Sequence, residues 1–180
     1  MNRSPVHFSP VQRWLHWSMA IAMLAMLFIG VIMVSTLSQA HTLLIAVHRP
    51  LGIAILVLVA IRIGVRLRRG SPPLPDSLPS VQKTAARASH VLLYALMLIL
   101  PIVGWAMVSA GGYPVTLFGA FHLPPVVPAD ARVFALLRAL HSWLAFALFA
   151  LVLVHLAAAL LHGLIKRDGV FSSMARGHRR

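Results

Sequence analysis

The sequence predicts an all-α integral membrane protein, a four-helix bundle, and three observations carry this prediction. First, 59% of the 180 residues are hydrophobic and only 11% are charged, against about 45–50% and 25% in soluble domains. Second, four apolar blocks each reach the roughly 20 residues that cross about 30 Å of hydrocarbon. Third, the basic residues gather between these blocks. We expect one domain, 1–180, with helices over roughly 10–34, 43–67, 82–109 and 133–166.

The first of these helices has a recognisable start. Ser9 can cap it, Pro10 suits the first helical position, and Gln12 completes a capping-box pattern. An alternative interpretation is a cleaved signal peptide, because residues 38–40 resemble a cleavage site. The apolar block is longer than the usual core of a signal peptide, so a first transmembrane helix is favoured.

The positions of lysine and arginine predict the topology. The segment between the first two helices has no charge, and the one between the last two has only Asp130 and Arg132. Basic residues flank the remaining helix ends: Arg3, Arg13, Arg66, Arg68, Arg69, Lys83, Arg87, Lys166, Arg167, Arg176, Arg179 and Arg180. The positive-inside rule therefore places both termini and the middle loop in the cytoplasm.

Composition excludes several classes of function. The chain has no cysteine, which excludes disulfides, cysteine-ligated zinc, iron–sulfur clusters and covalently attached c-type haem. A net charge of +13 at pH 7 would also suit a nucleic-acid-binding protein. Here the charges lie between apolar blocks, so we expect cytoplasmic flanks that face anionic membrane lipid and no nucleic-acid partner.

Histidines are the candidate ligands. His141 and His155 are 14 residues apart on the last helix, a spacing that returns within about 40° of the same face after about 21 Å. His162 lies seven residues further, within about 20° of the same direction. This stripe suits two stacked macrocycles, one in each half of the membrane.

Each macrocycle needs a second histidine at the same depth. His48, near the outer start of the second helix, matches His141, whereas His155 has two candidate partners, His16 and His90, between which depth alone does not choose. A single membrane histidine can instead bond a neighbouring helix. A transition-metal or proton-relay site usually recruits carboxylates, and the apolar blocks contain none. Paired imidazoles leave no open position on a haem iron, which suits electron transfer.

Several motifs in sequence order resemble one family. They are Arg13-Trp14-Leu15-His16-Trp17, His48-Arg49-Pro50-Leu51-Gly52, Arg62-Ile63-Gly64-Val65-Arg66 followed by Pro72-Pro73, Ala88-Ser89-His90 to Pro101-Ile102-Val103-Gly104, and His141 through His155 and His162 to Lys166-Arg167-Asp168. This order resembles the bacterial cytochrome b561 family of diheme four-helix membrane proteins, which includes superoxide:ubiquinone oxidoreductases. The resemblance spans nearly the whole chain.

The resemblance implies two haem b groups and their ligands. The inner haem would lie between His16 and His155, and the outer haem between His48 and His141. His90 would then not be a ligand.

The resemblance also implies a quinone site on the cytoplasmic side. In the family this site uses the last histidine of the fourth helix, here His162, with a lysine from the middle loop. No lysine stands at the matching position, where Asp76 and Ser77 lie nearby and Lys83 follows further on.

The activity that the resemblance implies is that of an oxidoreductase in the bacterial inner membrane. Electrons would pass from periplasmic superoxide through the two haems to ubiquinone on the cytoplasmic side. An alternative is a cytochrome b subunit that carries electrons between a partner dehydrogenase or hydrogenase and the quinone pool. A membrane scaffold without haem is a third hypothesis.

Arginines near the predicted ligands complete the candidate site. Arg62 is 14 residues after His48, so it should reach the depth of the inner haem and pair with a propionate; the alternative is that it extends to the inner interface. Arg49 and Arg138 adjoin the outer ligands, against the usual charge bias of the outer side. We assign them a role in attracting superoxide. The alternatives are pairing with the outer haem's propionates and, for the nearby Arg132, pairing with Asp130.

Overall fold

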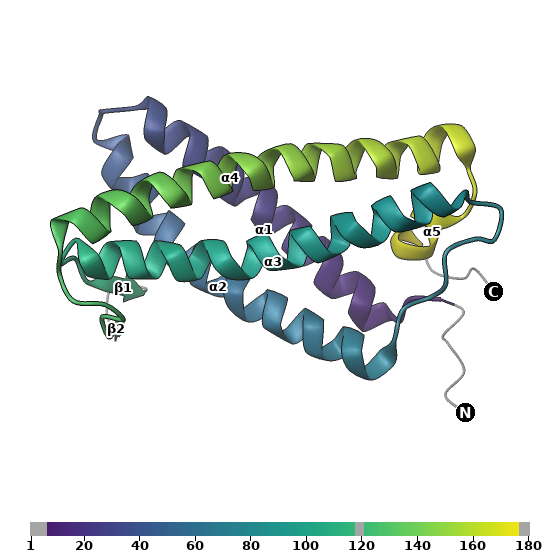
Figure 1. The fold of residues 1–180 in the computed structure, drawn as a ribbon, viewed down its shortest axis with the longest axis horizontal. Coiled ribbons are helices and arrows are strands. Elements are labelled where there is room, and N and C mark those ends of the chain that lie inside the picture. The colour runs from purple at the N-terminus through teal and green to yellow at the C-terminus, as the bar shows by residue number, and fades with distance from the viewer. Residues whose placement is uncertain (1–6, 118–120, 177–180) are drawn as a thin grey trace.

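The structure is a computed structural model that describes residues 7–117 and 121–176. Four long helices dominate it (Figure 1): α1 (Pro10–Ser35), α2 (Ala40–Arg69), α3 (Ser80–Ala110) and α4 (Ala131–Leu160). A π-helical turn, η1 (Leu161–Lys166), continues α4, and the short helix α5 (Val170–Ala175) follows. Two strands, β1 (Val115–Leu117) and β2 (Phe121–Leu123), lie between α3 and α4.

The four long helices are apolar and long enough to cross a membrane. Their most apolar stretches have mean hydropathies of 2.3 to 2.7, and the last span, α4 with η1, covers 36 residues. Large apolar side chains point outward, including Trp14, Phe28 and Trp143, which are 79%, 58% and 75% exposed. Outward apolar faces are what lipid contact requires. The protein is therefore a multi-pass membrane protein, and the predicted all-α fold class is confirmed.

Both ends of the bundle show the expected capping chemistry. The Ser9 hydroxyl accepts a hydrogen bond from the Gln12 amide, and the Gln12 side chain accepts one from the Ser9 amide. The predicted capping box is thus confirmed. Asp130 caps α4 through hydrogen bonds from the amides of Arg132 and Val133.

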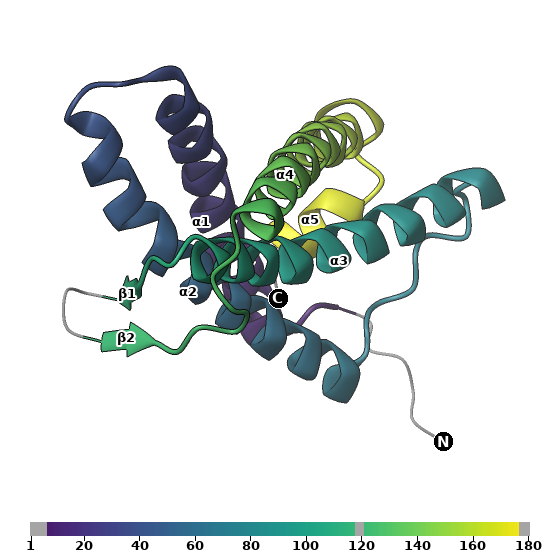
Figure 2. The same cartoon turned by 60° about the vertical axis from the view of Figure 1, so that its left-hand side comes forward.

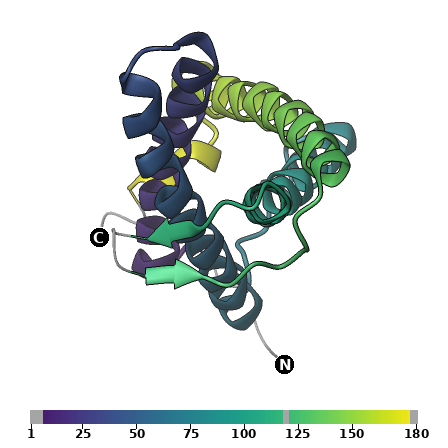
Figure 3. The same ribbon diagram turned by 90° about the vertical axis from the view of Figure 1, so that its left-hand side faces the viewer.

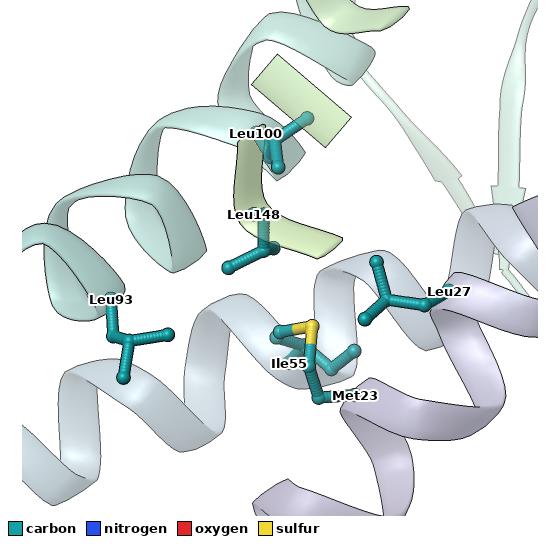
Figure 4. Packing of buried hydrophobic residues seen from close by; sticks show 6 residues of the cluster. All are labelled: Met23, Leu27, Ile55, Leu93, Leu100 and Leu148. Atoms are coloured by element: carbon teal, nitrogen blue, oxygen red, sulfur yellow. The ribbon is translucent and has the colours of Figure 1, made fainter. Parts of the chain in front are cut away.

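The bundle consists of two helical hairpins. α1 packs on α2, α3 packs on α4, and the hairpins meet where α2 lies against α3. α1 and α4 make few direct contacts, so the bundle is splayed on that side (Figures 2 and 3). The buried cluster at the centre draws on all four helices, as Figure 4 shows: Met23, Leu27, Ile55, Leu93, Leu100 and Leu148.

One end of the bundle, here called the inner end, holds the start of α1, α5 and the connection between α2 and α3 (Figure 1). The opposite, outer end holds β1 and β2, which pair antiparallel with Val115 opposite Leu123. The hairpin was not predicted. It is tied to α3 where Trp105 Nε1 donates to the Pro124 carbonyl at 3.0 Å and the Val126 amide donates to Ser109 Oγ at 3.2 Å.

Candidate haem sites

The outer candidate site joins α2 to α4. The imidazole rings of His48 and His141 meet edge to face, with centroids 6.2 Å apart and planes inclined at 67°. The Nδ1 atoms of both rings are buried and lack a hydrogen-bond partner, and no other buried side-chain nitrogen or oxygen in the described part of the chain is left so. An unpaired buried polar atom is costly. Two of them at one point indicate a site shaped for a ligand.

The ring separation fits a metal held between the two imidazoles. An imidazole nitrogen binds a metal at about 2.0–2.1 Å, so two opposed rings on one ion have centroids roughly 6–6.5 Å apart. A haem iron takes both axial ligands from such a pair. Clusters of three or more potential metal-ligating side chains are absent from the described residues, and a haem, which brings four nitrogens of its own, does not require one.

A cavity extends from these two histidines into the bundle. It has about 920 Å³ of space free of protein atoms, its open mouth included, and most of its lining is aliphatic, aromatic or methionine side chain. Gly30 lines the cavity, and Gly104 packs closely on the His141 ring. A Cβ atom at Gly104 would lie 3.2 Å from His141 Cε1, and one at Gly30 would lie 3.9 Å from His48 Cε1. The cavity is thus suited to a flat apolar macrocycle.

The inner candidate site joins α1, α3 and α4. The ring centroids of His16 and His155 are 6.4 Å apart, and those of His90 and His155 are 5.5 Å apart. The structure therefore brings all three inner candidates together. The His16–His155 separation is close to that of the outer pair, and the His90–His155 separation is shorter.

Arg62 lies beside the inner histidines. Its guanidinium donates to the Tyr94 hydroxyl at 3.0 Å and to the Gln12 carbonyl at 2.8 Å, and it interacts electrostatically with all three rings. Gln12, only 5% exposed, in turn donates to the Gly70 carbonyl at 2.8 Å. Sequence reasoning missed Gln12 and Tyr94 as partners, because they lie on other helices. The contacts join Arg62 to α3 and to the first turn of α1.

His162 lies in η1 and contacts a residue that sequence reasoning did not select. Its Nδ1 is 2.5 Å from Asp168 Oδ2. Lys83, in the first turn of α3, pairs with Asp76 at 3.7 Å. Lys166, on η1, donates to the Gln82 side chain of α3 at 2.9 Å.

The outer arginines differ in their contacts. Arg49 donates to the Pro114 carbonyl at 3.3 Å, which ties it to the segment leading into the hairpin. The exposed guanidinium of Arg138 makes no hydrogen bond or ion pair with any residue that the structure describes. The suggested pairing of Arg132 with Asp130 is wrong at the level of side chains, because Asp130 binds backbone amides instead.

Comparison with known proteins decides the family. The family model for prokaryotic cytochrome b561 matches residues 7–177. The chain belongs to the prokaryotic cytochrome b561 family. It is 33% identical to cytochrome b561 homolog 2 of Escherichia coli K12 over 96% of this chain and 93% of the relative. It is 30% identical to cytochrome b561 homolog 1 of the same organism over 97% of both chains.

A further relative is the probable superoxide oxidase CybB of Yersinia pestis, which is 32% identical over 71% of this chain and 72% of its own length. Family membership makes this cytochrome b561 a bacterial multi-pass membrane protein with b-type haem and an oxidoreductase of the electron-transfer kind. The paired histidines described above are the side chains that fit such a haem.

Proposed function

We propose that this cytochrome b561 passes electrons from superoxide at its outer end through two haem b groups to ubiquinone at its inner end. The observation that carries the proposal is the stacking of two opposed histidine pairs along α4. The pairs have ring separations of 6.2 and 6.4 Å, and their α4 members are 14 residues, about 21 Å, apart. Such a stack spans most of the hydrocarbon layer of about 30 Å.

In this proposal, His48 and His141 hold the outer haem and His16 and His155 hold the inner one. Each haem, when bound, accepts and donates one electron at its iron. The paired imidazoles would hold each haem and would leave no open site for oxygen to bind. The apolar lining around the outer pair excludes water. The basic inner-end segments support a cytoplasmic position for both termini and this end, which would put the outer haem on the periplasmic side.

Superoxide as the electron donor is supported by charge at the outer end and by the Yersinia pestis relative. Arg49 and Arg138 lie next to the outer ligands in sequence, and the Arg138 guanidinium is exposed. A positive surface can raise the capture rate of an anion by roughly 10–10³-fold. Superoxide is an anion and short-lived, so we assign these arginines a steering role, in which the haem edge accepts the electron.

Steering predicts a strong effect of salt. Superoxide-driven haem reduction is expected to slow steeply as ionic strength rises, because salt screens the attraction between the arginines and the anion. Arg138→Gln and Arg49→Gln are expected to flatten this slope while haem content stays intact. The measurement is stopped-flow haem reduction at several salt concentrations. Arg132→Gln is the matched control, since its position is further from the ligands along α4.

A rate that does not depend on salt in the unaltered protein would contradict the steering role. If superoxide did not reduce the haem at all and a large dehydrogenase or hydrogenase co-purified with the chain, the subunit function would replace this proposal. The two outcomes can be told apart, because a rate that does not depend on salt removes only the steering role and still allows the protein to oxidise superoxide.

Arg62 is proposed to compensate an inner haem propionate. Its position among His16, His90 and His155 and its bonds to Tyr94 and Gln12 keep its charge at the depth of the inner haem. A nearby positive charge favours the reduced haem over the oxidised one. Removing the charge of Arg62 should therefore lower the midpoint potential of the inner haem.

Arg62→Gln is therefore expected to lower the midpoint potential of the inner haem more than that of the outer haem. A redox titration of the purified protein measures both. Arg68→Gln, on the exposed end of α2, serves as the control, with both potentials unchanged. Equal shifts of the two haems in Arg62→Gln would show that Arg62 does not act at the inner site.

A further inference from the structure

The inner end of the molecule holds a histidine–carboxylate pair that the haem sites do not use. His162 Nδ1 and Asp168 Oδ2 are 2.5 Å apart, and their side chains are only 16% and 17% exposed. The other oxygen of Asp168 accepts a hydrogen bond from the Val170 amide at 3.2 Å. Both carboxylate oxygens are thus engaged, and the carboxylate has a fixed orientation toward the imidazole.

The backbone between the two residues turns sharply to bring them together. Arg167 has φ 49°, and no other non-glycine residue in the described ranges has a positive φ. Gly169 follows with φ 87°. A non-glycine residue in the left-handed region is strained, and such strain gathers at functional sites. The π-helical form of η1, in which His162 lies, is also frequent at functional sites.

Helix α5 holds this turn in place. The Phe171 ring lies against Gly163, where a Cβ atom would be 2.9 Å from the ring, and it meets the Trp17 ring edge-on at 6.5 Å between centroids. Trp17 Nε1 donates to the Met174 carbonyl at 3.3 Å. The pair is therefore fixed against α1 next to the candidate inner ligand His16.

The carboxylate of Asp168 determines which nitrogen of the His162 ring carries the proton. Burial raises the pKa of Asp168, but hydrogen bonds from His162 and from the Val170 amide outweigh it and hold that pKa below its ordinary value. An ionised carboxylate only accepts hydrogen bonds, so His162 Nδ1 must carry a proton and donate it. The Nε2 atom is then the one left to exchange a proton with a ligand.

We propose that Asp168 is a positioning residue that makes His162 the proton donor for quinone reduction at the inner end. The inference rests on the proposed function. Reduction of ubiquinone takes two electrons, supplied by two superoxide anions that become oxygen, and two protons. The His162 Nε2–H bond breaks as an O–H bond forms at one quinone oxygen, and Nε2 then takes a proton from cytoplasmic water. The second quinone oxygen takes its proton from solvent.

The other charged side chains on the elements around the His162–Asp168 pair do not take the positioning role of Asp168. The elements around it carry Lys166, Arg167, Arg176, Arg13, Lys83 and Arg87. In the described structure none of them bonds to His162 or Asp168, and Lys166 and Arg167 are engaged with Gln82 and the Leu164 carbonyl. All are cations, so Asp168 is the one carboxylate that contacts the His162 ring in the described structure.

The test compares Asp168→Asn with the unaltered protein over a pH range. Asparagine keeps an acceptor for Nδ1 but removes the charge. Haem content and superoxide-driven haem reduction should stay unchanged. Reoxidation of the reduced haems by ubiquinone should be about tenfold slower in Asp168→Asn near pH 8. As the pH rises, the reoxidation rate of this variant should begin to fall about one pH unit lower than that of the unaltered protein. Asp168→Glu should restore much of the rate. Asp130→Asn, a carboxylate at the outer end whose N-cap of α4 an asparagine can also make, is the control.

The ring itself provides a second measurement. In protein with ¹⁵N-labelled histidine, the signal missing from His162→Ala identifies His162, and it should report a protonated Nδ1 that is lost in Asp168→Ala. An unchanged tautomer in Asp168→Ala, or a pH profile of Asp168→Asn that overlies that of the unaltered protein, would overturn the role of Asp168 and leave the proposed function intact. Normal quinone reduction in His162→Ala would instead overturn the proposed quinone site together with this inference.

Discussion

Replacing His48 or His141 with alanine is expected to remove one haem of two and to leave the other with an unchanged spectrum. Each of these rings supplies one axial ligand of the outer haem, and a haem with one ligand in an apolar cavity loses the bond that fixes it. His16→Ala and His155→Ala are expected to do the converse. The amount of haem per polypeptide and the reduced-minus-oxidised spectrum measure this loss. We expect each variant to lose about half of the total haem.

His90→Ala is the decisive comparison in this series, because His90 is the histidine closest to His155 and yet is proposed not to bind iron. It should retain both haems. If His90→Ala lost the inner haem and His16→Ala kept it, the inner ligand would be His90, and the 6.4 Å separation of His16 and His155 would have no role in haem binding.

Replacing His162 with alanine is expected to leave both haems in place and to slow their reoxidation by ubiquinone about 100-fold or more. The reason is that a reduced quinone oxygen needs a proton, and a positioned general acid contributes roughly 10²–10⁴-fold to such a step. His162 lies seven residues beyond His155, about 10 Å along the helix. Stopped-flow oxidation of the pre-reduced protein by quinone gives the rate.

The control for this variant is His122→Ala, which removes an exposed histidine of β2 at the outer end. Its reoxidation by quinone should match that of the unaltered protein. Equal rates in His162→Ala and His122→Ala would place the quinone elsewhere, for instance beside His90.

The fold could be predicted from sequence because membrane crossing depends on local properties. Length and hydropathy of a segment decide whether it spans. With η1 counted as part of the last helix, the observed helices begin and end within three residues of the expected 10–34, 43–67, 82–109 and 133–166. The capping box at Ser9 also depends only on neighbouring residues, so it too could be predicted from sequence. The β1–β2 hairpin was missed because two strands of three residues carry little periodic signal, and the contacts of Trp105 and Ser109 that hold it come from α3.

The candidate site could be predicted only in part. Depth along a helix follows from the constant rise per residue, which was enough to match His48 with His141. It did not separate His16 from His90, since both lie near the inner end of their helices and both rings lie near His155 in the structure. Asp168 was missed because its contact with His162 depends on the unusual backbone of Arg167 and the docking of α5.

The central claim, that electrons flow from superoxide through both haems to quinone, is tested most directly by mixing the oxidised protein with superoxide in a stopped-flow spectrometer. The account predicts rapid reduction of haem without added quinone, followed by reoxidation when ubiquinone is supplied. In a variant that has lost the outer haem, such as His141→Ala, the remaining haem should be reduced much more slowly. Haems that stay oxidised in superoxide while ordinary chemical reductants reduce them would contradict the account.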